Sequence, residues 1–467
     1  MMYRLSGLPY QKIFAFAVCA QLFALLFDLA CPVSFYLPEI TTAVLTVIIL
    51  GRVLMRKDTL YFSFQNRIVV FLLTALLGYL VLDVLSFLRS GFAVFWVKYR
   101  VAGVSMINAV GIMMAVRKRA LTGKNILAVI YLAGIAAGIL GAVTGLGLKT
   151  GGISYTNRIT LRNDYNMYAT VLFSAGCSGL GVYLTGKKNT GSQLLFWLSE
   201  AFLWCMIYLS GSRRMVMALL PAAILFVAAV MKEHRNDWKK KAVAAAAVLL
   251  LTAVSSAAVN GWITREESNK SSSETTLPQR YETVKGAEKI AEEQGALKTR
   301  RVLWGAAWDE LRYRLFSSPA EFLFGMGGGY DIELYDRLLR EKKDERFNRI
   351  FAEEEKYQGK LSAHNFLLAD GLNGGVTKAA AAVIFWGVAI VAAGRAVRKN
   401  WQEGLSAAML LGVVFVNNMI SNRYGFLYDK YFYLVILLLV VLLEGEIQRN
   451  DAKRNGNMHS DFGASMG

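Results

Sequence analysis

Residues 68–88 read IVVFLLTALLGYLVLDVLSFL, an apolar run of 21 residues in which Asp83 is the one charged side chain. A helix of about 20 apolar residues spans the roughly 30 Å hydrocarbon core of a bilayer. Within lipid only helices and closed barrels satisfy their backbone hydrogen bonds, and this run lacks the polar–apolar alternation of a barrel strand. The stretch therefore predicts a membrane-spanning helix.

Similar runs recur along the 467 residues, which are 55% hydrophobic with a mean hydropathy of +0.38. We expect about twelve transmembrane helices, at residues 13–31, 35–54, 68–88, 96–116, 126–146, 166–185, 194–210, 215–231, 242–260, 373–394, 405–421 and 431–446. The predicted fold class is an all-α, polytopic integral membrane protein. Helices 1–9 fall in residues 1–260 and helices 10–12 in residues 366–448, separated by a large, partly helical loop, 261–365, and followed by a tail, 449–467.

Lysine and arginine gather in alternate connections between the predicted spans, for example in residues 52–67, 117–124, 232–241 and 395–399. Positive loops stay in the cytoplasm. Both termini are therefore predicted to be cytoplasmic and the loop 261–365 to lie outside, in a multi-pass protein of the cytoplasmic (inner) membrane. The net charge of +18 is explained by these short loops, which meet anionic lipid, and does not indicate nucleic-acid binding.

A histidine, an amide and a carboxylate meet at the end of the long loop, where residues 362–375 read SAHNFLLADGLNGG. His364 is the one histidine of the three that is predicted to lie outside. Imidazole titrates near neutral pH, so it can take a proton from an attacking hydroxyl. Asn365 fits two interpretations, a catalytic partner that orients His364 or binds a sugar hydroxyl, and a helix N-cap. This junction is the predicted catalytic site.

Two arginines, Arg213 and Arg214, lie between two apolar runs in the sequence Ser210-Gly-Ser-Arg-Arg. Arginine at the centre of a span costs about 2.5–3.5 kcal/mol, so both are expected at the outer interface or in a polar cavity. Guanidinium binds phosphate through two parallel hydrogen bonds. The pair therefore predicts a pyrophosphate site, and the alternative is an interfacial anchor.

Other polar residues are predicted at the same outer side. Arg100 and Arg300 add positive charge, and Asp164 and Asn166 precede or begin a span in a cluster typical of sugar sites. Residues 325–329, Gly-Met-Gly-Gly-Gly, predict a tight turn rather than a dinucleotide site, because no strand–turn–helix pattern surrounds them. The four cysteines avoid the long loop, so we predict no disulfide framework, and no metal or cofactor motif is present.

The order of these motifs resembles the O-antigen ligase and polymerase superfamily (Wzy/WaaL type), whose members have about a dozen spans and one large outer loop. His364-Asn365 followed by nine residues and Gly375 resembles the family signature, although Lys378 departs from its last position. The remaining resemblances are Ser210-Gly-Ser-Arg213 before a span, Arg300-x-x-x-Trp304, Gly325-x-Gly and Asp164-Tyr-Asn166.

The resemblance implies metal-independent, inverting glycosyl transfer from a polyprenyl-pyrophosphate donor. His364 and Asn365 would be catalytic, Arg213, Arg214 and Arg300 would bind pyrophosphate, and Asp164, Asn166 and Arg100 would bind substrate. The implied partners are an undecaprenyl-pyrophosphate-linked oligosaccharide, a glycan acceptor and membrane lipid, with a chain-length regulator and a flippase as further partners. No cofactor and no nucleic acid are expected.

Three functions remain open at this point. The first is polymerisation of repeat units into a surface polysaccharide, such as an O-antigen, capsule or exopolysaccharide. The second is a ligase that moves a finished glycan to a different acceptor. The third is a flippase or transporter, which fits less well because such proteins usually show a two-fold internal repeat that this sequence lacks.

Overall fold

The computed structural model describes residues 8–31, 37–55, 64–88, 93–118, 120–147, 153–154, 158–161, 165–186, 189–233, 239, 246, 295–342, 344–351, 357–359, 361–420 and 426–444. The predicted span 242–260, residues 261–294 of the long loop and the tail 449–467 lie outside the described residues, apart from residue 246.

Ten of the described helices are long and apolar enough to cross a membrane. They are α1 (Leu8–Ala30), α2 (Leu37–Leu54), α3 (Arg67–Leu88), α4 (Ala93–Arg117), α5 (Gly123–Gly147), α6 (Tyr165–Thr185), α7 (Thr190–Leu209), α8 (Arg213–Glu233), α16 (Phe366–Lys399) and α17 (Trp401–Ile420). They correspond to ten predicted spans. The predicted span 431–446 is α18 (Lys430–Glu444), a 15-residue apolar helix that is almost wholly buried. The predicted all-α, polytopic membrane fold is confirmed.

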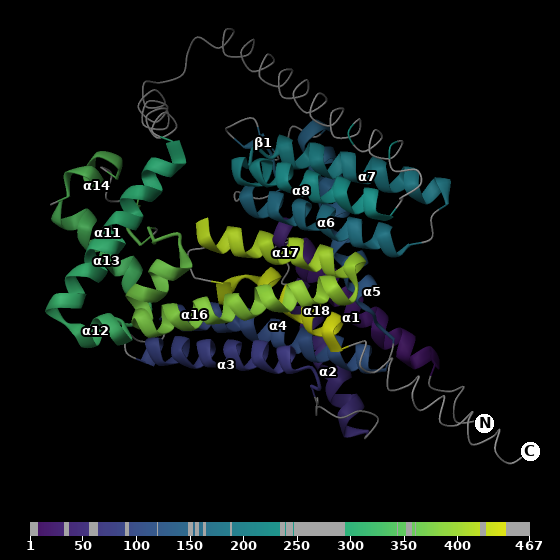
Figure 1. Cartoon of the computed structure of the whole chain (residues 1–467), viewed down its shortest axis with the longest axis horizontal. Coiled ribbons are helices and arrows are strands. Elements are labelled where there is room, and N and C mark those ends of the chain that lie inside the picture. Colours follow the sequence, from purple (N-terminus) through teal and green to yellow (C-terminus); the bar gives the residue numbers. More distant parts are fainter. Residues whose placement is uncertain are drawn as a thin grey trace, which may run out of the picture.

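The helices pack as a bundle in which α6 occupies the centre, between α5, α7 and α17 (Figure 1). Small side chains allow this close approach, as is usual between membrane helices. A Cβ added to Gly134 of α5 would lie 2.1 Å from the Cβ of Ala175 on α6. On the other side of the bundle, α16 packs against α3, α17 and α18.

Helices of the long loop gather at one end of the bundle (Figure 1). They are α11 (Gly295–Ser317), α12 (Pro319–Phe324), α13 (Tyr330–Glu341) and α14 (Glu345–Ile350). An apolar cluster joins them to the start of α16, with Leu303, Tyr335, Phe347, Ala363 and Ala369 among its members. The loop helices and the membrane bundle are therefore packed together at this end.

The charged residues from about 332 to 357 predict a single helix that leads to His364, and this prediction is wrong. The chain reverses at Lys342, which has a φ of 50°, and α14 begins anew at Glu345. Asp344 caps the second helix by accepting hydrogen bonds from the N–H groups of Arg346 and Phe347 at 2.9 and 3.2 Å. Local capping outweighs the continuous helical pattern here. Residues 153–154 and 158–159 form a short antiparallel pair, β1 and β2.

α16 changes direction at Gly375, where φ is 72° and ψ is −178°. The chain thus forms a short helix, 366–374, before the longer membrane helix continues. Asp370 lies on the short segment, and Lys378 lies just beyond the break. The break sets the position of the predicted catalytic pair at the start of the helix.

Candidate active site

His364 occupies a sharp turn immediately before α16. Its φ of 49° lies in the left-handed region, which is uncommon for a residue with a Cβ and costs of order 1–3 kcal/mol. Asn365 follows in an extended conformation, and its side-chain oxygen accepts hydrogen bonds from the N–H groups of Leu367 and Leu368 at 3.0 and 3.3 Å. The N-cap interpretation of Asn365 is confirmed. His364 itself is half-buried.

Trp304 holds the chain next to His364. Its indole Nε1 donates to the carbonyl oxygen of Ala363 at 2.9 Å, and the hydroxyl of Tyr335 donates to the carbonyl of Leu303 at 2.8 Å. Ala363 is fully buried in an apolar cluster that also contains Leu303 and Tyr335. The Arg-x-x-x-Trp element of α11 therefore positions the histidine turn.

The glycine turn 325–329 and the break at Gly375 form one unit. The N–H groups of Met326 and Gly327 donate to the carbonyls of Leu372 and Asn373, both at 3.0 Å. A Cβ on Gly375 would lie 2.3 Å from the carbonyl oxygen of Leu323, and a Cβ on Gly325 would lie 2.4 Å from that of Asn373. Only glycine allows the two backbones to approach so closely at positive φ.

The same turn also reaches α3. The N–H of Gly328 donates to the carbonyl oxygen of Ser86 at 2.8 Å, and Asn373 exchanges hydrogen bonds with Asp331 at 3.0 and 3.1 Å. The helices α11 to α14, which together form the loop domain, are thereby fixed to the ends of α3 and α16. The glycine turn and the break at Gly375 are far apart in the sequence but in contact in the structure. The contact is possible because neither Gly325 nor Gly375 has a Cβ that would collide with the other segment.

A buried ion cluster below this turn was missed by sequence reasoning. Lys378 Nζ lies 2.5 Å from Asp83 and 3.0 Å from Asp370, and the hydroxyl of Tyr79 donates to Asp370 at 2.9 Å. Lys378 and Asp83 are 1% and 0% exposed. The sequence offered no partner for Asp83. One signal was available in the sequence. Asp83 lies in one apolar run and Lys378 in another, and opposite charges inside a membrane are expected to pair.

Glu200 also has a partner that the sequence did not reveal. Its carboxylate accepts a hydrogen bond from Trp204 Nε1, one turn further along α7, at 3.1 Å. Within the described residues, no group of three His, Cys, Asp and Glu side chains lies close enough to hold a metal ion.

The predicted pyrophosphate arginines have different surroundings. Arg214 Nη1 donates to Asn417 of α17 at 3.0 Å. Arg213 is the first residue of α8, and its side chain lies outside what the structure describes. Arg300 of α11 is half-buried. Burial lowers the pKa of Arg300, and the charge of Tyr165 at the start of α6 partly offsets this effect.

The residues predicted to bind substrate differ in their surroundings. Asn166 accepts a hydrogen bond from the hydroxyl of Ser212 at 2.8 Å, which joins the start of α6 to the turn before Arg213. Asp164 lies outside the described residues. Arg100 is exposed on α4, and no hydrogen bond or ion pair joins it to the other described candidates.

The structure therefore brings the starts of α6 and α8 together, through Asn166 and Ser212, at the end of the bundle that carries the loop helices. His364 lies at this same end, held by α11. The His364 turn, Arg214 and Asn166 thus lie at the end of the bundle where the membrane helices meet the loop helices.

Comparison with known proteins identifies a family that covers part of this site. The model of the O-antigen ligase family matches residues 198–382, a segment that includes α8, the loop helices, His364 and Lys378. The resemblance to the O-antigen ligase and polymerase superfamily is confirmed over that segment. A search of curated proteins found no match to the chain.

Proposed function

We propose that this chain, whose residues 198–382 carry the O-antigen ligase domain, polymerises oligosaccharide repeat units borne on polyprenyl pyrophosphate at the outer face of the cytoplasmic membrane. The observation that carries the proposal is the half-buried His364 turn, held by Trp304 and placed where α16 begins. A base at the end of a helix bundle can meet a sugar whose lipid carrier stays in the bilayer.

The reaction is a substitution at the anomeric carbon of the donor sugar. A hydroxyl oxygen of the acceptor glycan attacks this carbon, while the bond to the pyrophosphate oxygen breaks and polyprenyl pyrophosphate leaves with the electron pair. His364 accepts the proton of the attacking hydroxyl. The configuration at carbon inverts. For a polymerase, the donor and the acceptor are both lipid-linked repeat units.

Guanidinium groups stabilise the negative charge that grows on the leaving group. We assign this role to Arg213, Arg214 and Arg300, because fixed cations that need no rearrangement lower a barrier most effectively. Arginine also binds phosphate oxygens in pairs.

We assign Asn365, Asp164, Asn166 and Arg100 to the sugars. Asn365 remains next to the base while its oxygen caps α16, so its amide N–H groups are the part available to a hydroxyl. Asn166 lies one hydrogen bond from the turn that precedes Arg213, and this supports a place for the sugar next to the pyrophosphate.

A ligase is the second candidate, and the match to the O-antigen ligase family is consistent with either activity. The two activities share the donor and the chemistry, and they differ in the acceptor. A ligase would transfer a finished glycan once to another molecule, whereas a polymerase would add repeat units successively.

The test uses the purified protein in detergent with a polyprenyl-pyrophosphate-linked oligosaccharide of one repeat unit. A ladder of products on a gel, with release of polyprenyl pyrophosphate, supports polymerisation. A single shifted product that needs a second acceptor supports the ligase. Absence of turnover, together with movement of the lipid-linked glycan across proteoliposome membranes, would contradict both and indicate a flippase.

A further inference from the structure

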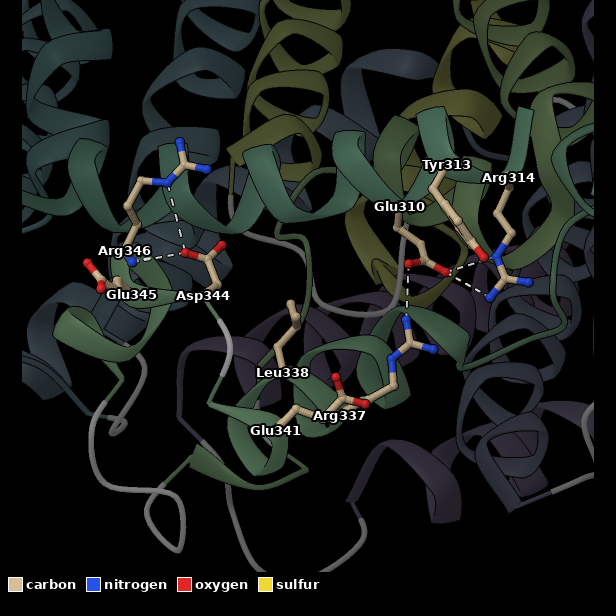
Figure 2. Close-up of a pocket in the computed structure, with 9 residues that line it drawn as sticks. All are labelled: Glu310, Tyr313, Arg314, Arg337, Leu338, Glu341, Asp344, Glu345 and Arg346. Carbon is tan, nitrogen blue, oxygen red and sulfur yellow. Dashed lines mark hydrogen bonds and ion pairs between the residues drawn. The ribbon is translucent and has the colours of Figure 1, made fainter. Parts of the chain in front are cut away.

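A groove with a volume of about 900 Å³ lies on the loop domain between α11, α13 and α14 (Figure 2). This volume is at the upper end of the range for ligand sites, about 300–1,000 Å³. Four carboxylates and three guanidinium groups line the groove, and its other lining side chains are Tyr313 and Leu338. None of the predicted site residues contributes to it.

The floor of the groove is an ion-paired network centred on Glu310. This carboxylate accepts hydrogen bonds from Arg314 Nε at 2.9 Å, from Arg337 Nη2 at 3.0 Å and from the hydroxyl of Tyr330 at 2.6 Å. Arg314 also bonds to Glu321 of α12. The groups are therefore held in place before any ligand arrives, which reduces the entropy cost of binding.

Hydrogen-bonding capacity remains at this floor. A guanidinium has five N–H donors. The contacts of Arg337 with Glu310 and Tyr330 use only part of that set. Neighbouring donors and carboxylate acceptors are what vicinal hydroxyl groups require.

One wall of the groove is aromatic. The side chain of Tyr313 is 61% exposed, and the guanidinium carbon of Arg314 lies 5.7 Å from the centre of its ring. Figure 2 shows Tyr313 next to Arg314, with Arg337 reaching Glu310 from the opposite helix. An exposed ring supplies an apolar face with a polar edge, which suits the C–H face of a sugar.

The lining charge separates the classes of ligand. Four carboxylates against three guanidinium groups give the lining no excess of positive charge, so a polyanion such as pyrophosphate gains no net attraction. A hydrophobic peptide would find little apolar surface in the groove besides Leu338. A polyhydroxylated ligand without strong net charge matches the mixture of donors, acceptors and one ring.

We infer that this groove is a second saccharide-binding site, which holds sugars of the glycan chain at a distance from the reacting end. The inference rests on the proposed function. α11 is one continuous helix that carries Trp304 at the histidine turn and Tyr313 at the groove. Arg300 and Tyr313 are separated along the helix by about 20 Å, so several sugar rings fit between the two sites.

The test compares Tyr313→Ala with a matched control, Trp308→Ala. Trp308 is an aromatic residue of the same helix, is 63% exposed and does not line the groove. The probe is a set of lipid-free oligosaccharides, two to four repeat units long, released by mild acid from the surface polysaccharide of the source cell. Binding to the purified full-length protein is measured by calorimetry.

Tyr313→Ala is expected to weaken oligosaccharide binding at least tenfold, whereas Trp308→Ala and the ring-preserving Tyr313→Phe stay within twofold of wild type. Inorganic pyrophosphate should not compete. Equal affinity of Tyr313→Ala and wild type would overturn the inference, as would an equal loss in Trp308→Ala or no binding by the wild type.

This outcome is separable from the proposed function. If the wild type binds the oligosaccharide through Tyr313 but releases no polyprenyl pyrophosphate, the saccharide site in the groove is supported and the transferase activity is contradicted. If the wild type releases polyprenyl pyrophosphate but binds the oligosaccharide independently of Tyr313, the transferase activity is supported and the saccharide site in the groove is contradicted.

Discussion

Lys378 neutralises two carboxylates inside the bundle, Asp83 of α3 and Asp370 of the short segment before the break. Lys378 departs from the family signature at this position, and Asp83 supplies the opposite charge that pairs with it. Lys378→Met should destabilise the protein by about 3–5 kcal/mol, because removal of one partner leaves buried charge uncompensated. Thermal unfolding in detergent measures the effect.

Lys430→Met is the matched control. Lys430 pairs with Asp28 at 3.3 Å, but the two side chains are 17% and 21% exposed. Its loss should cost less than the loss of Lys378, because this pair is less deeply buried. The account of the buried cluster is wrong if the two variants unfold alike, or if Lys378→Met/Asp83→Leu is no more stable than Lys378→Met.

Glu310 makes the stability of the loop domain depend on pH. Burial alone would raise its pKa, but hydrogen bonds from Tyr330 and Arg314 and the charges of Arg337 and Arg314 outweigh burial and lower the pKa. A pKa that is lower in the folded state stabilises the fold above the unfolded value, about 4.3, and this contribution is lost as the pH falls through the folded value.

Hydrogen exchange of α11 and α13 measures this dependence. At neutral pH, Glu310→Gln should exchange faster than wild type in both helices. The difference should begin to shrink below about pH 4.3, the ordinary pKa of glutamate, and should disappear only below the lowered pKa of the folded state. A difference that stays constant across this range would show that the ionised carboxylate does not stabilise the domain.

At the scale of elements, the contact between the glycine turn and the break in α16 decides where His364 lies. Gly375→Ala places a Cβ against the carbonyl of Leu323 at a φ of 72° and should destabilise the protein by more than about 1 kcal/mol. Glycan transfer should fall with it, because the segment that begins at His364 loses its position.

Gly387→Ala and Gly394→Ala are controls on the same helix. A Cβ at either position meets nothing within 4 Å. Both should be neutral or stabilising by up to about 1 kcal/mol, because alanine favours a helix more than glycine does. Full transfer activity in Gly375→Ala would contradict the role of the contact.

The sequence predicted elements better than the contacts between them. Length and hydropathy are local properties, so ten predicted spans, the cap at Asn365 and the turn at residues 325–329 were confirmed. The pairing of Lys378 with Asp83, and the fit of Gly325 against Gly375, depend on which distant segments meet. The break between α13 and α14 was missed because Asp344 reads as one more charge in a helical pattern.

For the whole molecule, the distribution of positive charge predicts that both termini are cytoplasmic and that the long loop is outside. In a variant without the four native cysteines, Ser272→Cys should react with a membrane-impermeant maleimide in intact cells. Ser460→Cys should react only after lysis. Labelling of Ser460→Cys in intact cells would reverse the predicted orientation.

The central claim is that His364 is the base of a glycosyl transfer at the end of the helix bundle. Its most direct test compares wild type, His364→Ala and the control His459→Ala in the C-terminal tail, each purified, with a polyprenyl-pyrophosphate-linked oligosaccharide as donor. Release of polyprenyl pyrophosphate should fall about 100-fold or more in His364→Ala and stay unchanged in His459→Ala. Release by His364→Ala at the wild-type rate would contradict the claim.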